Sequence, residues 1–330
     1  MSVPFFGRAD VERAVSPAEA YEAVREGFVA YARGEWAMQP KLYVTNYPAG
    51  DFRAMPAIGG GHALLKWVTS FPGNPALGLP TVTGLVVLND AETGMLAAVL
   101  DAGAVTALRT GAAAVLAAAT LGRGGSVAVV GCGVNGTAAA RTFAALGLGV
   151  SVWDVDAARA SAVAAALGAA LAPSREEALS ADVVVTMTPG REILFPAGSL
   201  RPGQHVSLMG ADGPGKAEIA VEEIARARLF CDDWEQDGTK GTLSPRVRLF
   251  VDDWEQASHG GETAQAVEAG LIGRDDVTEL GAVLAGNAPG RQHEDDVTLF
   301  DSTGLAIQDL AIAKAALVRA DQLDLPRLDL

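Results

Sequence analysis

The chain has 330 residues, of which 49% are hydrophobic and 20% are charged, and it carries a formal net charge of −15. This length predicts two domains, each large enough to bury a core of its own. The acidic balance argues against a nucleic acid or a membrane surface as partner, because both require clustered Lys and Arg, and it favours a small molecule.

Two cysteines, Cys132 and Cys231, cannot form a disulfide framework and show no CxxC spacing. We therefore expect a reducing compartment and no structural zinc. The first residues lack a basic region followed by an apolar run, and no apolar run reaches membrane-spanning length without Gly or a charge. None of the four histidines has metal-ligand spacing. The sequence thus predicts a cytoplasmic protein without a bound metal.

The first hundred residues are predicted to form a helical region followed by a sheet. Residues 9–34 place apolar positions at helical spacing, and Ser16 offers an N-cap. From residue 41 to residue 100, short β-rich runs are divided by Gly and Pro, which predicts an antiparallel or mixed sheet with a turn at DAETG, residues 90–94. An Ala-rich helix is expected over residues 107–123, ending at Gly122.

Strands and helices then alternate. Near-continuous apolar strands such as SVAVVG, ADVVVTMT and HVSLMGAD are separated by helical runs, which predicts a parallel sheet covered on both faces. Residues 263–272, 277–286 and 305–323 are expected to be helical. The predicted fold class is α/β: a Rossmann-type doubly wound parallel sheet plus a smaller α+β domain, with no Pro/Ser-rich linker between them.

The Gly-rich turn VAVVGCGVNG lies between a predicted strand and a predicted helix. Gly131 permits a tight turn, Gly133 allows the backbone to approach a pyrophosphate, and Gly136 allows the helix to pack closely on the strand. Asp154 ends the next strand, where a carboxylate binds a ribose and repels a 2′-phosphate. This pattern favours NAD over NADP. The alternatives are a purely structural Gly turn and, for Asp154, a solvated strand end.

Four charged residues are candidates for chemistry. Lys66 stands among apolar neighbours, where an ammonium needs an anionic partner and is a plausible acid–base group; the alternative is that it reaches water from a strand edge. Arg109 precedes an Ala-rich helix and suits a carboxylate, unless it is a surface arginine. Arg53 lies in the same β-region. Asp212 follows a strand at its carboxyl end, where it can face a cofactor's reactive ring or serve only as a turn residue.

These residues stand in a longer series of motifs that resembles the ornithine cyclodeaminase/mu-crystallin family and, within it, the archaeal-type NAD-dependent alanine dehydrogenases. The series covers nearly the whole chain and includes GDFRAMPA, LKWV, FPGNPALGLPTV, LNDAETG, ALRTGAAA, GADGPGK, VDDWEQASHGGE and FDSTGLAIQD. The resemblance implies a substrate-binding and dimerisation domain from residues 1–118 and 305–330. It also implies an NAD-binding Rossmann domain over residues 119–304 and a homodimer.

The resemblance also implies roles for single residues. Lys66 would be the proton donor or acceptor at the substrate, Arg53 and Arg109 would hold a substrate carboxylate, and Asp212 would lie beside the amine or imine. The implied cofactor contacts are Thr110, Asn135, Gly136, Asp154, Thr188, Lys216 and Ser302. For Thr188, Lys216 and Ser302 the motifs are short, and each of these residues could equally be a cap or a surface residue.

Members of this family oxidise amino acids, reduce cyclic ketimines or cyclise ornithine and lysine. Cyclodeaminases carry an acidic residue near the place of Arg53, and a basic group there disfavours a side-chain ammonium by like-charge repulsion. We therefore predict an NAD-dependent dehydrogenase that interconverts a small L-amino acid, alanine first, with its 2-oxo acid and ammonia. The alternatives are a cyclodeaminase, a ketimine reductase, or a non-catalytic NAD(P)H-binding protein of the mu-crystallin type.

A nine-residue segment occurs almost unchanged twice, as RLFCDDWEQ from Arg228 and RLFVDDWEQ from Arg248. A solenoid needs at least three repeats, and there is no third copy. The resemblance implies a single such segment. Its spacing fits the first copy when measured from Lys216 and the second when measured back from Glu262. We expect a tandem duplication with one copy outside the sheet, as a loop or an added edge strand.

Overall fold

The computed structural model describes residues 2–211, 213, 215–227 and 246–329. The chain divides into two compact units. Unit 1 comprises Met1–Ala113 and Leu305–Leu330, and unit 2 comprises Ala114–Gly304. The division falls inside one helix, α3 (Ala102–Leu121), so that the chain passes from the first unit to the second without a separate linker.

Unit 1 contains a mixed sheet of eight described strands. The order is β16-β1-β7-β6-β5-β4-β2, with β3 paired to β4; β1 and β7 are parallel and the other pairs are antiparallel. The sheet predicted over residues 41–100 is therefore confirmed, whereas its strands from the two chain ends were not predicted. The strands are β1 (Ser2–Phe6), β2 (Ala37–Met38), β3 (Leu42–Asn46), β4 (Gly50–Gly59), β5 (His62–Ser70), β6 (Val82–Asp90), β7 (Leu96–Asp101) and β16 (Arg327–Asp329).

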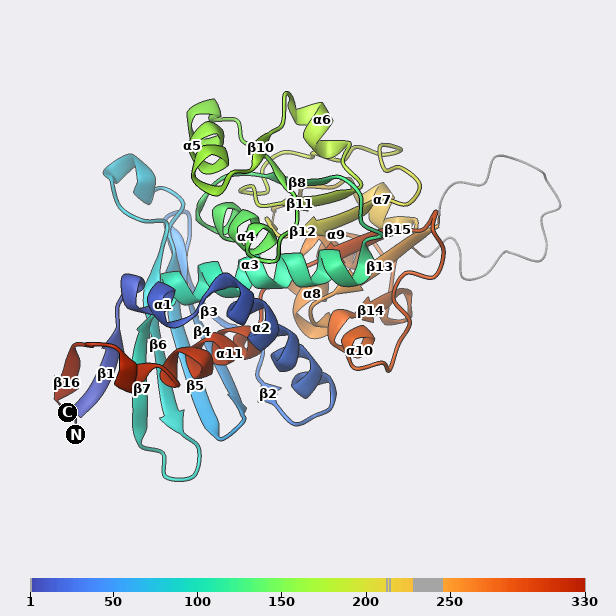
Figure 1. The fold of residues 1–330 in the computed structure, drawn as a ribbon. Helices are drawn as coiled ribbons and strands as arrows, with labels where there is room; N and C mark the ends of the chain where they lie inside the picture. The colour runs from blue at the N-terminus through green and yellow to red at the C-terminus, as the bar shows by residue number, and fades with distance from the viewer. Residues whose placement is uncertain (1, 212, 214, 228–245, 330) are drawn as a thin grey trace, which may run out of the picture. The chain divides into compact units, whose positions relative to one another are not determined.

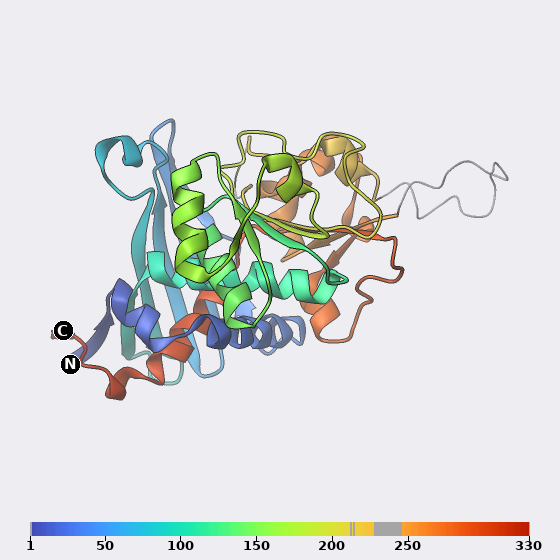
Figure 2. The same cartoon turned by 45° about the horizontal axis from the view of Figure 1, so that its top comes forward.

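Helices α2 (Pro17–Ala32) and α11 (Ala306–Leu317) lie side by side along this sheet, and α11 packs on β4 and β5 (Figure 1 and Figure 2). The predicted cap of α2 is present: the Ser16 hydroxyl accepts a hydrogen bond from the Glu19 N–H, and the Glu19 carboxylate accepts one from the Ser16 N–H. The remaining helices of the unit are α1 (Arg8–Ala14), η1 (Asn74–Leu77) and η4 (Ala320–Gln322).

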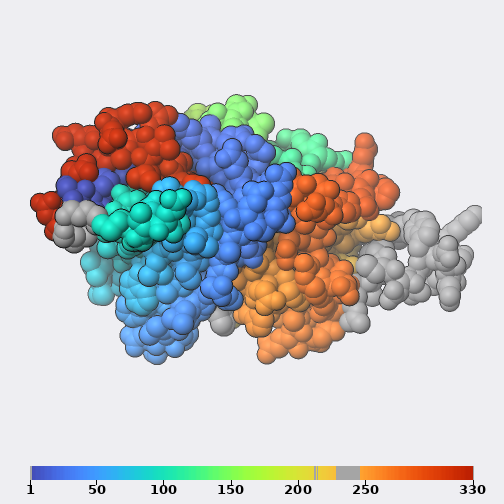
Figure 3. Space-filling view, turned by 90° about the horizontal axis from the view of Figure 1, so that it is seen from below, coloured from blue at the N-terminus to red at the C-terminus, as the bar shows by residue number. Residues whose placement is uncertain are grey.

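Both ends of the chain build unit 1. Figure 3 shows residues from the C-terminal part, in red, beside those of the N-terminal part, in blue. The antiparallel pairing of β1 with β16 and the packing of α2 on α11 account for this adjacency. A residue late in the sequence can therefore complete a site that begins on the early strands.

Unit 2 contains an entirely parallel sheet of eight described strands, ordered β10-β9-β8-β11-β12-β15-β13-β14. The order reverses direction at β8, which confirms the predicted doubly wound fold class. The strands are β8 (Val127–Val130), β9 (Ser151–Trp153), β10 (Ala170–Leu171), β11 (Val183–Thr186), β12 (His205–Leu208), β13 (Val247–Val251), β14 (Val277–Glu279) and β15 (Val297–Asp301).

Both faces of this sheet are covered. Alternate residues such as Val130, Val184 and Val206 belong to one apolar core. From the intervening positions, the hydroxyls of Ser207 and Thr298 donate to carbonyl oxygens of α3. Burial on both sides explains why these strands are almost continuously apolar. The helices are α4 (Val134–Ala145), α5 (Ala157–Leu167), α6 (Arg175–Leu179), α7 (Val221–Ala225), α8 (Trp254–Gly260), α9 (Glu262–Glu268), η3 (Arg274–Asp276) and α10 (Leu280–Leu284).

Three sequence-based expectations need correction. Residues 277–286 are not helical throughout, because the first three form β14 before α10 begins. The strand β15 was not predicted. Helix α3 begins at Ala102, five residues before the expected start, because its first residues follow β7 directly. Among the described residues, α3 is the one helix long and apolar enough to cross a membrane, but 72% of its apolar window is buried inside the protein.

The second copy of the repeated segment forms part of the sheet of unit 2. Arg248–Val251 lie in β13, between β15 and β14, and Trp254–Gln256 begin α8. The Asp253 side chain caps α8 by accepting a hydrogen bond from the Gln256 N–H. The first copy, residues 228–236, lies outside the described residues.

Candidate active site

Lys66 lies on β5 in unit 1 and is buried, with 1% of its surface exposed. Its Nζ donates a hydrogen bond to Asp309 Oδ1 on α11, at 2.9 Å. The alternative in which Lys66 reaches water from a strand edge is therefore wrong. The anionic partner that burial demands comes from a segment 243 residues away in sequence.

Burial lowers the pKa of Lys66 from its ordinary value of 10.5 to about 8. The cause of the decrease is loss of hydration, reinforced by the positive charges of Arg109 and Arg53, while the Asp309 carboxylate acts in the opposite direction. A lysine with this pKa exchanges protons readily near neutral pH, which suits a general acid or base.

Arg109 lies on α3 and is also buried, so that the surface-arginine alternative is wrong. Its Nη1 donates to Gln308 Oε1 at 3.2 Å, and its Nε lies 3.6 Å from Asp309 Oδ1, too far for a hydrogen bond. Lys66 and Arg109 thus flank the same carboxylate from two different elements.

Four buried polar atoms of this cluster and its neighbour Thr110 have no hydrogen-bond partner. Buried polar groups in native proteins are almost always paired with protein atoms, water or a ligand, so a group of polar atoms without a protein partner is suited to bind a polar ligand. Two of them are donors and point to a ligand with acceptor oxygens. The atoms are Arg109 Nε, Gln308 Nε2, Asp309 Oδ2 and Thr110 Oγ1.

Arg53 lies on β4, on the same face of the sheet as Lys66, because Met55 is the cross-strand neighbour of Lys66 and is two residues from Arg53. Its guanidinium donates to both oxygens of Asp51, at 2.6 and 3.2 Å, and lies 5.3 Å from the centre of the Tyr43 ring. These contacts hold the guanidinium in one place, and its charge contributes to the low pKa of Lys66.

Gln308 and Asp309 were not among the candidate residues of the sequence analysis. Both stand in the motif FDSTGLAIQD, in a helix whose other residues are mainly apolar and buried. The sequence did contain one signal, because a buried lysine requires an anionic partner. It did not identify the anion, since an acidic side chain on any neighbouring element would have satisfied it.

The Gly-rich turn of unit 2 has the geometry that its sequence predicts. Gly131 has a φ of +102°, which favours glycine. A Cβ at Gly136 would lie 1.7 Å from the Gly131 carbonyl oxygen, so that only glycine permits this packing of α4 on β8. A Cβ at Gly133 would meet nothing within 4 Å, which leaves open space above the turn at the start of α4. Asn135 lies half-buried in the first turn of that helix.

Asp154 is buried just beyond β9, so that it is not a solvated strand end. Its Oδ2 accepts a hydrogen bond from the Cys132 N–H at 2.6 Å, and its Oδ1 accepts one from the Asp156 N–H at 2.8 Å. Arg159 Nη1 lies 3.4 Å from Oδ1. Asp154 therefore holds the Gly-rich turn against the next strand.

The remaining predicted cofactor residues of unit 2 have varied surroundings. The Thr188 hydroxyl donates to Glu218 Oε1 at 2.6 Å, and the Ser302 hydroxyl donates to Asp252 Oδ2 at 3.0 Å. Lys216 is half-buried, and its carbonyl accepts a hydrogen bond from Gln265. Asp212 lies outside the described residues. In the described part of the chain, no group of His, Cys, Asp and Glu residues is arranged to hold a metal ion.

Three buried carboxyls belong to Asp301, the last residue of β15, and to Glu218 and Glu262, which lie outside the strands of unit 2. Burial, together with the charges of Asp301 and Glu218, raises the pKa of Glu262 to about 9. Burial likewise raises the pKa of Asp301 to about 7. None of the three was a sequence-based candidate.

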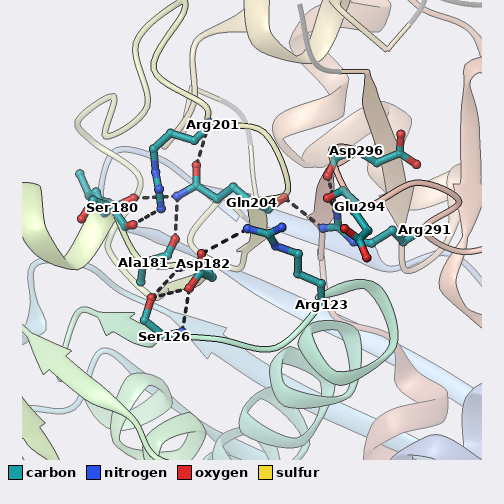
Figure 4. Close-up of polar contacts among 11 residues, drawn as sticks. Arg123, Ser126, Ser180, Ala181, Asp182, Arg201, Gln204, Arg291, Glu294 and Asp296 are labelled. Carbon is teal, nitrogen blue, oxygen red and sulfur yellow. Dashed lines mark hydrogen bonds and ion pairs between the residues drawn. The ribbon is translucent and has the colours of Figure 1, made fainter.

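The amino ends of the same strands carry polar side chains that satisfy one another (Figure 4). Asp182 accepts hydrogen bonds from the N–H and the hydroxyl of Ser126, both at 2.9 Å. Gln204 Nε2 donates to the carbonyls of Leu179 and Ala181. Arg291 donates to the carbonyls of Leu121 and Gln204. This edge is held together by its own contacts, so that the carboxyl edge is the better candidate for a ligand site.

Comparison with known proteins identifies the family. The sequence profile of the ornithine cyclodeaminase/mu-crystallin family matches residues 4–322. The chain belongs to this family. The family predicted from the motifs is thereby confirmed.

Its relatives differ in activity. The chain is 42% identical to an alanine dehydrogenase of Archaeoglobus fulgidus, over 92% of this chain and 91% of that protein. A solved archaeal alanine dehydrogenase dimer with bound NAD superposes with a TM-score of 0.88 at 39% identity, covering 100% and 99% of the two chains. The iminosuccinate reductase of Paracoccus denitrificans with NAD+ gives a TM-score of 0.84 at 27% identity, covering 100% of both chains. Other relatives are pyrroline-2-carboxylate reductases and ornithine cyclodeaminases.

Proposed function

We propose that this protein is an NAD-dependent oxidoreductase that interconverts a small L-amino acid, alanine first, with its 2-oxo acid and ammonia. The observation that carries the proposal is the buried cluster of Lys66, Arg109 and Asp309, in which a lysine with a lowered pKa lies beside unpaired polar atoms. The proposal assigns substrate binding to unit 1 and cofactor binding to unit 2.

The cofactor assignment rests on the Gly-rich turn. The space above Gly133 and the close packing at Gly136 fit a dinucleotide pyrophosphate at the start of α4, whose free N–H groups favour an anion. We assign ribose binding to Asp154, which follows β9 directly; a carboxylate there disfavours a 2′-phosphate and so favours NAD over NADP. Two of the similar solved structures contain NAD or NAD+. When bound, the nicotinamide supplies the hydride acceptor or donor.

The substrate carboxylate is proposed to bind Arg109 and Arg53. The unpaired Nε of Arg109 and Nε2 of Gln308 are donors that a carboxylate would satisfy. Arg53 adds a second positive charge that Asp51 holds in place. This charge disfavours a substrate with a terminal ammonium, such as ornithine, and favours a small uncharged or acidic amino acid.

Proton transfer is assigned to Lys66. In the direction of amino-acid oxidation, neutral Lys66 accepts a proton from the water that adds at the substrate carbon, and in reverse its ammonium returns that proton. Asp309 orients the Nζ by the 2.9 Å hydrogen bond and stabilises the protonated form. Asp212 stays a predicted stabiliser of positive charge on the substrate nitrogen.

A homodimer is part of the proposal. On β5, the buried Lys66 alternates with Leu65 and Trp67, which are 44% and 42% exposed. Leu85, the cross-strand neighbour of Trp67 on β6, is 45% exposed. Large apolar side chains on an open sheet face are typical of a protein interface. Light scattering of the purified protein should give twice the mass of one chain; a monomer would contradict this assignment.

One assay tests the proposed function. NADH absorbance is followed with pyruvate plus ammonia, with a cyclic imine acid such as pyrroline-2-carboxylate, and with ornithine. NADH consumption that requires both pyruvate and ammonia supports the proposal. Consumption with the cyclic imine alone would establish an imine reductase, and loss of ornithine without net NADH change would establish a cyclodeaminase. Tight NADH binding without turnover would indicate a non-catalytic binding protein.

A further inference from the structure

Glu218 is fully buried in unit 2 and accepts four hydrogen bonds with its carboxylate. Oε1 accepts from the N–H and the hydroxyl of Thr188, at 3.0 and 2.6 Å. Oε2 accepts from the hydroxyl of Thr186 at 2.5 Å and from the Gly210 N–H at 3.0 Å. One side chain therefore joins the segment that follows β11 to the segment that follows β12.

The backbone around these contacts is closely packed. A Cβ at Gly210 would lie 2.5 Å from Glu218 Cδ, so that Gly210 is needed for the carboxylate to fit. The Glu218 carbonyl accepts hydrogen bonds from the N–H groups of Leu194 and Phe195, at 2.7 and 3.1 Å. The Glu218 N–H donates to Glu262 Oε1 at 2.6 Å. The backbone of Glu218 is thus held in place by contacts that do not involve its carboxylate.

The position of these strand ends indicates which part of a dinucleotide they serve. The Gly-rich turn follows β8 and Asp154 follows β9, on one side of the point where the strand order reverses. Strands β11 and β12 lie on the other side of β8. In a doubly wound sheet the dinucleotide lies across this point, so that its two halves meet opposite sets of strands. If the adenosine half lies at β8 and β9, the nicotinamide half is expected at the ends of β11 and β12.

We propose that Glu218 is a positioning residue for the nicotinamide half of the cofactor, acting through Thr188 and Gly210. This inference rests on the proposed function, because it requires NAD to bind unit 2. It goes beyond the proposed function in assigning the placement of Thr188 and Gly210, at the ends of β11 and β12, to one buried carboxylate.

The hydrogen-bond pattern explains why the group is a carboxylate. Each oxygen accepts from one backbone N–H and from one threonine hydroxyl. A glutamine amide would direct its NH₂ group at a backbone N–H in either orientation, and a buried donor would lose its acceptor. Only a side chain with two acceptor oxygens satisfies both strand ends.

Calorimetric titration with two ligands tests the inference on the full-length protein. NADH contains both halves of the cofactor, whereas ADP-ribose lacks the nicotinamide. We expect Glu218→Gln to raise the Kd for NADH by about tenfold or more, as loss of buried hydrogen bonds to a charged group predicts, and to change the Kd for ADP-ribose by less than about twofold. A purely structural role would leave the ratio of the two constants unchanged.

Glu223→Gln provides a matched control. Glu223 is another fully buried glutamate of unit 2 that accepts a hydrogen bond from a backbone N–H, that of Gly198, and pairs with Arg226. It lies on α7, and its hydrogen bonds to Gly198 and Arg226 do not involve the ends of β11 and β12. We expect Glu223→Gln to lower the melting temperature and to keep the NADH to ADP-ribose ratio of the wild type.

Thr186→Val keeps the inference testable if Glu218→Gln does not fold. It removes one hydroxyl from Glu218 Oε2 and keeps the shape of the side chain. A smaller change in the same ratio is expected. The inference would be overturned by a wild-type ratio in folded Glu218→Gln or Thr186→Val, and also by an equal loss of affinity for both ligands. Failure of the wild-type protein to bind NADH at all would overturn the proposed function as well.

Discussion

Units 1 and 2 each bury a group of ionisable side chains, but the two groups carry opposite charge. In unit 1, Lys66 and Arg109 flank the single carboxylate of Asp309. In unit 2, Glu218, Glu262 and Asp301 bring three carboxyls together. Burial opposes the charged form in both places, so that it lowers the pKa of Lys66 to about 8 and raises that of Glu262 to about 9.

Glu218 and the lysine cluster differ in how their polar atoms are satisfied, although Glu262 Oε2 and Asp301 Oδ1 of unit 2 also lack a hydrogen-bond partner. The carboxylate of Glu218 accepts four hydrogen bonds from its own unit, which makes it a fixed structural anchor. In the lysine cluster, Gln308 Nε2 and Asp309 Oδ2 have no hydrogen-bond partner, and Arg109 Nε has only the 3.6 Å ion pair with Asp309. A buried polar group that is fully paired holds the protein together, whereas a set of unpaired groups around a titratable lysine is suited to a ligand and to proton exchange.

Replacement of the lysine should have the largest effect. Lys66→Ala removes the proposed proton acceptor, and we expect kcat to fall by about a thousandfold or more while the Kd for NADH stays within about twofold of the wild type. Steady-state turnover and NADH fluorescence measure the two quantities. Lys314→Ala, on α11 beside the Trp36 ring, is the control and should retain activity. Loss of NADH affinity in Lys66→Ala would move this lysine to the cofactor site.

Arg53→Gln tests the substrate-binding part of unit 1. Loss of one positive charge at the carboxylate should raise the KM for pyruvate by roughly ten- to a hundredfold, as for other hydrogen bonds to a charged group, with a smaller effect on kcat. Initial rates at varied pyruvate concentration, with saturating NADH and ammonia, give both constants. An unchanged KM would show that Asp51 holds Arg53 for a structural purpose only.

Asp309→Asn tests the control of the lysine pKa. Neutral Lys66 is the form that accepts a proton, so kcat/KM for amino-acid oxidation should rise with pH through an apparent pKa near 8. The Asp309 carboxylate raises this pKa, and its removal should therefore shift the rise to lower pH. We also expect the plateau to fall by about tenfold because the Nζ loses its orienting partner. A pH profile identical to that of the wild type would rule out this role.

Glu262→Gln tests the contrasting group and should have the smallest effect. Because the pKa of Glu262 is raised from 4.5 to about 9, the folded protein retains a proton that the unfolded chain releases. Its contribution to stability is complete below about pH 4.5 and is lost as the pH rises towards 9. Glutamine does not ionise and keeps an acceptor for the Glu218 N–H. The melting temperature should exceed that of the wild type by several degrees at pH 8 and match it at pH 5; a constant difference would contradict the assignment.

Local patterns in the sequence predicted much of the fold. Ser16 was identifiable as a cap because a serine before a proline and an acidic third residue satisfies the first N–H groups of a helix. The alternation of apolar strands with helices predicted the parallel sheet of unit 2. The strands β14 and β15 were harder to predict, because a short strand is defined by its neighbours in the sheet rather than by its own periodicity.

The candidate site was predictable only in part. Lys66 stood out because a charge among apolar neighbours is costly, Arg109 because it precedes an Ala-rich helix, and the Gly-rich turn because its spacing reflects backbone geometry. The role of Arg53 came from the resemblance. Gln308 and Asp309 did not, since α11 joins the early strands only in the folded protein. Glu218 was missed for the same reason: three of its four hydrogen bonds come from Thr186 and Thr188, which are 32 and 30 residues away in sequence.

The amino-acid sequence by itself determined the local chemistry of this protein: where helices begin, where glycine is required, and which cations need an anion. The tertiary structure decided which anion meets Lys66, that the second copy of the repeated segment joins the sheet, and which carboxylate joins the ends of β11 and β12. The physical reason is the distance along the chain over which each interaction acts. Caps, turns and alternation act within a few residues, whereas the pairing of buried charges depends on distances that only packing sets.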